Sequence, residues 1–138
     1  MNTSSIEPSA LRKYLKNVKD DWNYITALDF YNEYYLKKKK YYLIDLRGEK
    51  EYKKMHIKGA KNIFWLNILD EKNLKKLPKD ELIFLICYVG HTSSQVLTLL
   101  KLLGYKVVSI KYGYGLSPVK EVPVAGWLDY GLPTVSSK

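Results

Sequence analysis

The chain has 138 residues and is 46% hydrophobic, which supports one domain with a sizeable core and excludes two independent domains or disorder throughout. The net charge is +9, from 23 Lys plus Arg against 14 Asp plus Glu, so the surface favours anions. Because no recognised nucleic-acid motif accompanies this charge, we interpret it as a solvated basic surface and expect no nucleic-acid partner. A small anionic substrate would suit the same sign of charge.

The one cysteine, Cys87, excludes an internal disulfide and a cysteine-rich metal site of the zinc-finger type. Residues 1–7 carry no export signal, and the longest apolar run, Leu82–Val89, is much shorter than the roughly 20 residues that span a bilayer. We therefore expect a cytoplasmic protein that contacts no membrane and uses neither a metal nor a cofactor.

The first half of the chain is predicted to alternate between helices and strands. Thr26 is a typical N-cap residue, and the Lys37–Lys40 run lies between apolar segments as a solvated turn would. The strand that ends at Asp45 lacks polar alternation, which predicts burial on both faces of a parallel sheet. The predicted elements are a helix over 9–18, a strand at 24–25, a helix after Thr26 with Leu28, Phe30, Tyr31, Tyr34 and Tyr35 on its inner face, a strand over 41–45, a helix over 49–55 and a strand over 61–64.

The second half continues the same alternation. Residues 65–77 are predicted to be helical or irregular, and an apolar strand over 82–87 stops at the cysteine. A helix over 93–103 ends before Gly104, and a strand follows over 106–110. Strands separated by helix-length segments predict right-handed β-α-β crossovers. The predicted fold class is therefore an open, doubly wound α/β domain, with a mostly parallel sheet of about five strands and helices on both faces.

Cys87 lies where ligands bind in such sheets, outside the carboxyl end of a buried strand and before a helix. The loop that follows, Tyr88–Ser93, is short enough for successive backbone N–H groups to converge on one centre. These donors and the positive end of the helix dipole favour a thiolate, which would make Cys87 nucleophilic, and a protonated His91 would add to this effect. The alternative is a buried structural cysteine, a common state of free cysteines, but the strand-loop-helix context favours the nucleophile.

Five stretches of the chain also match a known family, in the right order. They are Ile44-Asp45-Leu46-Arg47 with Glu51-Tyr52, then His56-Ile57-Lys58-Gly59-Ala60-Lys61-Asn62-Ile63, then the strand and loop around Cys87, then Gly104-Tyr105-Lys106-Val107, and finally Gly126-Trp127 with Gly131-Leu132-Pro133. Together they resemble the rhodaneses, and the second stretch is the strongest match. We therefore predict an N-terminal helical extension at 1–22 and a rhodanese-like domain over 23–135.

The resemblance implies a sulfurtransferase. Cys87 would be the nucleophile that carries a persulfide, taking sulfane sulfur from thiosulfate or a related anionic donor and passing it to a thiol or to cyanide. Asp45 and Arg47 would be structural as a local ion pair, and His56 and Gly59 would be structural in a turn. The residues that the resemblance places in the loop around the persulfide or substrate are Tyr88, Val89, Gly90, His91, Thr92 and Ser93.

Two features depart from the family pattern. Many thiosulfate-using rhodaneses have a basic residue at the place of Thr92, and Thr92 with Gln95 fits a capping box, which predicts that the Thr92 side chain serves the helix start. The other departure is Tyr112-Gly113-Tyr114-Gly115, followed by 116–124 with two prolines. We interpret this segment as one wall of the cleft.

Other functions are open to a fold of this kind. The main alternative is a persulfide carrier that receives sulfur from a partner protein and turns over small donors slowly, and Thr92 favours it. A cysteine phosphatase or arsenate reductase would need an Arg to bind a tetrahedral dianion, and none lies between Cys87 and the C-terminus. An inert structural domain is disfavoured because the nucleophile is present.

Overall fold

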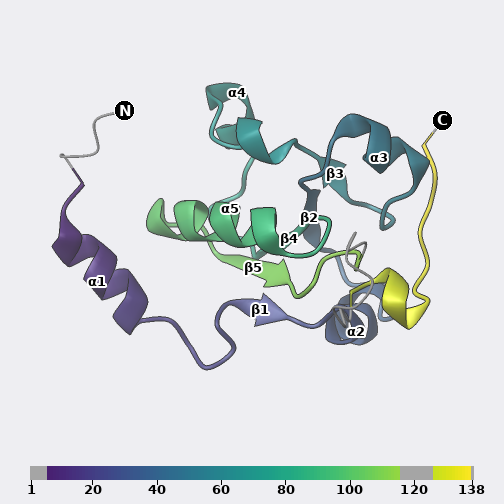
Figure 1. Cartoon of the computed structure of the whole chain (residues 1–138), viewed down its shortest axis with the longest axis horizontal. Coiled ribbons are helices and arrows are strands. Elements are labelled where there is room, and N and C mark those ends of the chain that lie inside the picture. The colour runs from purple at the N-terminus through teal and green to yellow at the C-terminus, as the bar shows by residue number, and fades with distance from the viewer. Residues whose placement is uncertain (1–5, 116–125, 138) are drawn as a thin grey trace.

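The computed structural model of the protein describes residues 6–115 and 126–137. Its sheet has the strand order β1-β5-β4-β2-β3, and each of the four strand pairings is parallel (Figure 1). This topology confirms the predicted doubly wound α/β fold. The strands are β1 (Tyr24–Ile25), β2 (Tyr42–Asp45), β3 (Lys61–Asn62), β4 (Ile83–Ile86) and β5 (Val107–Ile110).

Helices cover both faces of the sheet, because neighbouring residues of the buried strands point to opposite sides. On one face, Ile44 of β2 packs in a core with α5 (His91–Leu102). On the other, Leu43 packs in a second core with α2 (Ala27–Phe30) and with the π-helical turn Tyr31–Tyr35 that continues it. Strands buried on both faces explain the apolar runs without polar alternation.

The remaining helices lie at the edges. Helix α1 (Pro8–Lys16) contains no buried residue and stands apart from the sheet, joined to β1 by a loop with a turn over 20–23 (Figure 1). The division of the chain at 22–23 stays a prediction. The other helices are α3 (Glu49–Lys54), α4 (Glu71–Leu74) and two short 3-10 turns at Trp65–Asn67 and Leu128–Tyr130.

The predicted start of α2 is confirmed, but one residue that was predicted on its inner face lies on the outer face. The Thr26 Oγ1 accepts a hydrogen bond from the backbone N–H of Asp29 at 3.0 Å, as an N-cap does. Leu28 is 40% exposed, while Ala27 and Phe30 are fully buried. Leu28 precedes Phe30 by two residues, which places it about 200° around the helix, on the solvent side.

The start of α5 differs from the prediction as well. The helix begins at His91, two residues before the predicted 93, and its N-cap position is Gly90. Thr92 is therefore inside the first turn and is not a capping residue, so the predicted capping box with Gln95 is wrong. The predicted end is confirmed, because Gly104 follows the helix with a φ of 92°, a left-handed conformation that favours glycine.

Candidate active site around Cys87

The Cys87 side chain lies directly after β4, at the carboxyl end of the sheet, and is only 1% exposed. Its sulfur accepts hydrogen bonds from the backbone N–H of Gly90 at 3.1 Å and of Ser93 at 3.4 Å. Both donors belong to the turn that starts α5, so the positive end of that helix faces the sulfur. Gly90 permits this turn because its φ of 98° lies in the left-handed region.

The buried hydroxyl groups of Ser93 and Ser109 form a hydrogen-bonded pair that reaches the sulfur. Ser93 Oγ lies 3.3 Å from Cys87 Sγ and accepts a hydrogen bond from Ser109 Oγ on β5 at 2.8 Å. Because Ser109 donates to it, the Ser93 hydroxyl keeps its own proton for either the Gly90 carbonyl, at 3.2 Å, or the sulfur. Ser93 can therefore accept a hydrogen bond from a thiol and donate one to a thiolate.

The other loop residues lie around the sulfur without bonding to it. In the described ranges 6–115 and 126–137, the hydrogen bonds of Cys87 Sγ go to Gly90 and Ser93 alone, so the His91 imidazole, which is exposed, adds none. Tyr88 and Val89 are half-buried, and the Tyr88 hydroxyl lies 3.4 Å from the backbone N–H of Gly48. The Thr92 Oγ1 is buried and, within the described parts of the chain (6–115 and 126–137), has no hydrogen-bond partner.

The segment after β5 lies against this loop. The backbone N–H of Tyr114 donates to the Cys87 carbonyl and that of Gly115 to the Tyr88 carbonyl, each at 3.0 Å. Gly113 approaches so closely that a Cβ there would lie 2.2 Å from the Cys87 carbonyl oxygen, so only glycine fits. Residues 112–115 thus contact the cysteine loop, whereas the rest of the predicted wall, 116–124, lies outside the described residues.

An ion pair supports the neighbouring strand end. Asp45 and Arg47 are both buried, and the Arg47 guanidinium donates to both carboxylate oxygens, at 3.1 and 2.9 Å. The Tyr114 hydroxyl donates to Asp45 Oδ2 at 2.9 Å and its ring lies 3.9 Å from the guanidinium carbon. Burial opposes the guanidinium charge, but the hydrogen bond and charge of Asp45 outweigh it and raise the pKa of Arg47. Burial, followed by the charge of Asp45, raises the pKa of Tyr114, which stays a neutral donor.

His56 and Gly59 lie in a turn away from the sulfur. The His56 Nδ1 is 2.7 Å from the Tyr52 carbonyl, and the two rings stack at 3.8 Å. The backbone of His56 pairs with that of Val135 through two hydrogen bonds of 2.7 Å. Gly59 has a φ of 86°. This geometry fits residues that shape the chain, because the His56 contacts go to Tyr52 and Val135 and Gly59 takes a left-handed backbone conformation.

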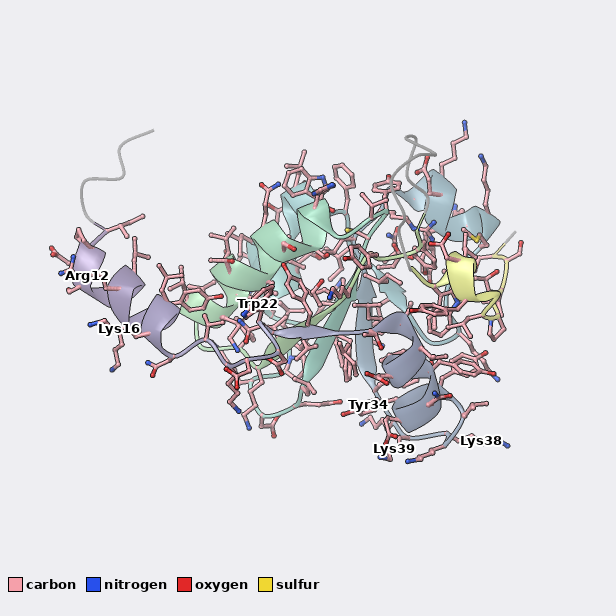
Figure 2. The ribbon with its side chains drawn as sticks, turned by 60° about the horizontal axis from the view of Figure 1, so that its bottom comes forward. Arg12, Lys16, Trp22, Tyr34, Lys38 and Lys39 are labelled. Carbon is pink, nitrogen blue, oxygen red and sulfur yellow. The ribbon has the colours of Figure 1, made fainter. Side chains whose placement is uncertain are left out.

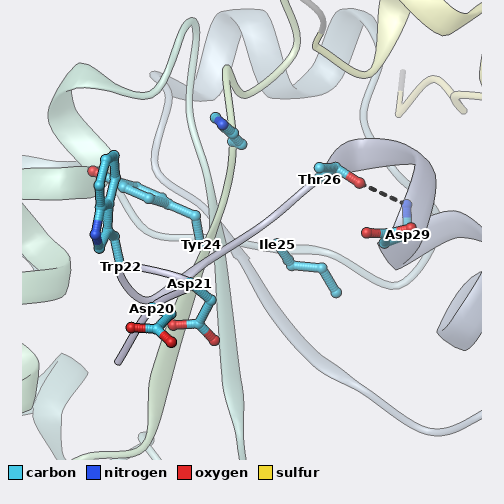
Figure 3. A pocket seen from close by; sticks show the side chains of 8 residues that line it. Asp20, Asp21, Trp22, Tyr24, Ile25, Thr26 and Asp29 are labelled. Carbon is cyan, nitrogen blue, oxygen red and sulfur yellow. Dashed lines mark hydrogen bonds between the residues drawn. The ribbon is translucent and has the colours of Figure 1, made fainter. Parts of the chain in front are cut away.

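A separate hollow of about 340 Å³ opens beside β1 (Figure 3). Three carboxylates, Asp20, Asp21 and Asp29, line it together with one cation, Lys111. Because negative charge is in excess, the hollow would repel an anionic sulfur donor and is not a candidate donor site.

Over residues 6–115 and 126–137, no three His, Cys, Asp or Glu side chains gather as a metal site would require. In the same part of the chain, no helix combines the length and the apolar character needed to cross a membrane.

Comparison with known proteins decides the family. The sequence profile described as "Rhodanese-like domain" matches residues 30–115, more than half of the chain. The chain belongs to the rhodanese-like domain family. The matched range contains all of the rhodanese-like site described above, from Asp45 to Gly115.

Solved structures and a curated relative agree with this family. The chain superposes with a TM-score of 0.64 on a rhodanese-related protein from Thermoplasma volcanium, at 25% identity over 81% of this chain and 96% of that one. A rhodanese-like domain protein from Staphylococcus aureus gives a TM-score of 0.61 at 25% identity, covering 72% and 95% of the two chains. The adenylyltransferase and sulfurtransferase uba4 of Ogataea parapolymorpha is 34% identical over 65 residues, which are 47% of this chain but only 16% of the relative's length.

Sequence reasoning missed two residues of this rhodanese-like site. Ser109 is the single polar residue of a buried strand, and buried hydroxyl groups need partners, so this signal was available. Tyr114 belongs to the segment that we interpret from sequence as one wall of the cleft, with no role of its own. Its contact with Asp45 joins residues 69 positions apart, which no local pattern could indicate.

We predict that Ser109→Ala slows alkylation of Cys87 by iodoacetamide at neutral pH by a factor of about five, since a lost buried hydrogen bond is worth about 1 kcal/mol. Without Ser109 the Ser93 hydroxyl is less well oriented to donate to the thiolate. Ser94→Ala is the matched control, because the Ser94 hydroxyl donates to the Gly90 carbonyl and does not contact the sulfur. Equal rates in the two variants would contradict the prediction.

Proposed function

We propose that this protein transfers sulfane sulfur through a persulfide on Cys87, from thiosulfate or a related anionic donor to a thiol or to cyanide. The observation that carries the proposal is the position of Cys87 Sγ, which accepts hydrogen bonds from Gly90 and Ser93 at the start of α5. These dipoles stabilise a thiolate, the reactive form of cysteine. Membership of the rhodanese-like domain family and the likeness to a sulfurtransferase support sulfur transfer as the general chemistry.

The reaction would proceed in two displacements. The Cys87 thiolate attacks the outer sulfur of thiosulfate, a new S–S bond forms, and the old S–S bond breaks so that sulfite leaves with its electron pair. Cyanide then attacks the outer sulfur of the persulfide, which forms thiocyanate and returns the thiolate. In both states the Gly90 and Ser93 N–H groups and the Ser93 hydroxyl would stabilise negative charge on sulfur.

The test is the intact mass of the reduced protein after incubation with thiosulfate and then with cyanide. We expect a gain of one sulfur atom that cyanide reverses, with thiocyanate released. No gain from thiosulfate would overturn that donor and leave mercaptopyruvate, polysulfide or a protein persulfide as the source. No gain from any of them would overturn the sulfurtransferase proposal.

A persulfide carrier is the second candidate, favoured by the loop composition. Residues 88–93 contain no Lys or Arg, and the Thr92 Oγ1 is buried with no hydrogen-bond partner among residues 6–115 and 126–137, so the loop offers no permanently charged side chain to a small dianion. A carrier would accept sulfur from a protein persulfide much faster than from thiosulfate. Steady-state rates with the two donors separate the candidates. Thiol chemistry of either kind suits a reducing compartment, and we propose the cytoplasm.

A further inference from the structure

A second hollow, of about 540 Å³, lies at the amino end of the sheet. It is formed by the turn that precedes β2 and the turn that precedes β3, whereas Cys87 follows the carboxyl end of β4. One strand length, on the order of 13 Å, separates the two ends. We call this hollow the lysine pocket, and its lining residues are Tyr35, Lys38, Lys39, Lys40, Tyr41, Lys58 and Gly59.

The walls of the lysine pocket are fixed by the fold. The Tyr41 hydroxyl donates to the Lys58 carbonyl, which ties the two turns together, and the Tyr41 ring packs edge-on against Phe30 of the core at 5.1 Å. On the other side, the Tyr35 ring stacks on Tyr31 at 5.3 Å. Because both aromatic walls are already ordered, a ligand would lose little free energy in shaping the pocket.

The charge of the pocket is one-sided. Four of its seven lining residues are lysines, and across 6–115 and 126–137 none of the four forms a salt bridge. The neighbouring Lys37 differs, since it pairs with Glu33 at 2.8 Å. Figure 2 shows Lys38 and Lys39 extending into solvent, far from the basic side chains of α1. An anion would relieve the mutual repulsion of these lysines.

The lining residues favour spaced carboxylates over a compact phosphate. Phosphate sites typically use Arg forks or the N–H groups of a helix N-terminus, and the pocket is lined by neither. Lysines are flexible point charges that suit separated carboxylates, and the tyrosine walls suit an apolar or aromatic side chain between them.

We propose that the lysine pocket docks an acidic segment of a partner protein, in which Asp or Glu residues alternate with apolar or aromatic ones. The docked segment would leave Cys87 free at the opposite end of the sheet. This makes the pocket a recognition surface separate from the sulfur chemistry.

Fluorescence anisotropy with a labelled Glu-Glu-Leu-Glu-Glu-Tyr-Glu-Glu peptide tests the proposal on the full chain. The triple variant Lys38→Glu, Lys39→Glu, Lys40→Glu is expected to raise the Kd by about tenfold or more, since several ion pairs are lost together. The matched control is Lys13→Glu, Lys16→Glu, Lys19→Glu, which changes the net charge equally and should raise the Kd by less than about threefold. Circular dichroism checks that both variants fold.

Further arms decide between ligand classes. Cys87→Ser should bind the peptide as the wild type does, so failure of the sulfur chemistry would not affect this result. Equal losses in the two triple variants would show only non-specific attraction and would overturn the proposal. Tighter binding of oligo-dT or of polyphosphate than of the peptide, at the same salt concentration, would also overturn it.

Discussion

Cys87→Ser is expected to take up no sulfur from any donor and to lower sulfur transfer to the uncatalysed rate. A serine hydroxyl has almost the same shape and can accept the same N–H groups of Gly90 and Ser93, so the fold should be retained. Its oxygen is not ionised at neutral pH and forms no persulfide. Because Cys87 is the sole cysteine of the chain, no other thiol can replace it. Intact mass and thiocyanate production measure the two losses.

The control for this prediction is Ser93→Ala, which keeps the nucleophile and removes one hydroxyl from beside it. That variant should still take up sulfur, at a reduced rate, because two backbone donors remain at the sulfur. Sulfur uptake by the Cys87→Ser protein would show that the reacting group lies elsewhere. If the Cys87→Ser protein no longer unfolded cooperatively, the cysteine would instead have a structural role.

The parts of the fold that sequence could predict depend on short-range patterns. The apolar run over 82–87 is confirmed as β4, because a strand buried on both faces needs no polar residue. The same apolar run also predicted the position of Cys87, at the end of a strand and before a helix. The Asp45–Arg47 ion pair, which the family resemblance implied, is also a local contact, because its partners are two residues apart.

The features that the sequence predicted wrongly or missed depend on distant contacts or on one backbone angle. The capping box at Thr92 fitted a standard pattern, but the left-handed Gly90 starts the helix two residues earlier and leaves Thr92 inside it. The hydroxyl pair of Ser93 and Ser109 joins a helix to a strand across 16 positions. Sequence patterns are evaluated within a short window of residues, so they do not predict contacts between distant positions.

Arg47→Met is expected to lower the free energy of unfolding by about 3–5 kcal/mol, the cost of breaking a buried ion pair by removing one partner. Among residues 6–115 and 126–137, the change leaves the fully buried Asp45 carboxylate with the Tyr114 hydroxyl and the backbone N–H at position 47 as its donors. It also removes the donor to the Met55 carbonyl, at 2.7 Å. Urea unfolding followed through the fluorescence of the three tryptophans, of which Trp127 is fully buried and reports on the core, measures the loss.

Two controls separate an unpaired buried charge from lost packing as the cause. Adding Asp45→Leu to Arg47→Met removes the orphaned carboxylate, so the double variant should be more stable than the single one although it lacks both charges. Lys53→Met breaks an exposed pair with Glu49 and should leave the unfolding curve unchanged. If the double variant were less stable than Arg47→Met, the guanidinium would act mainly through its packing on the Tyr114 ring, and the ion pair would contribute little.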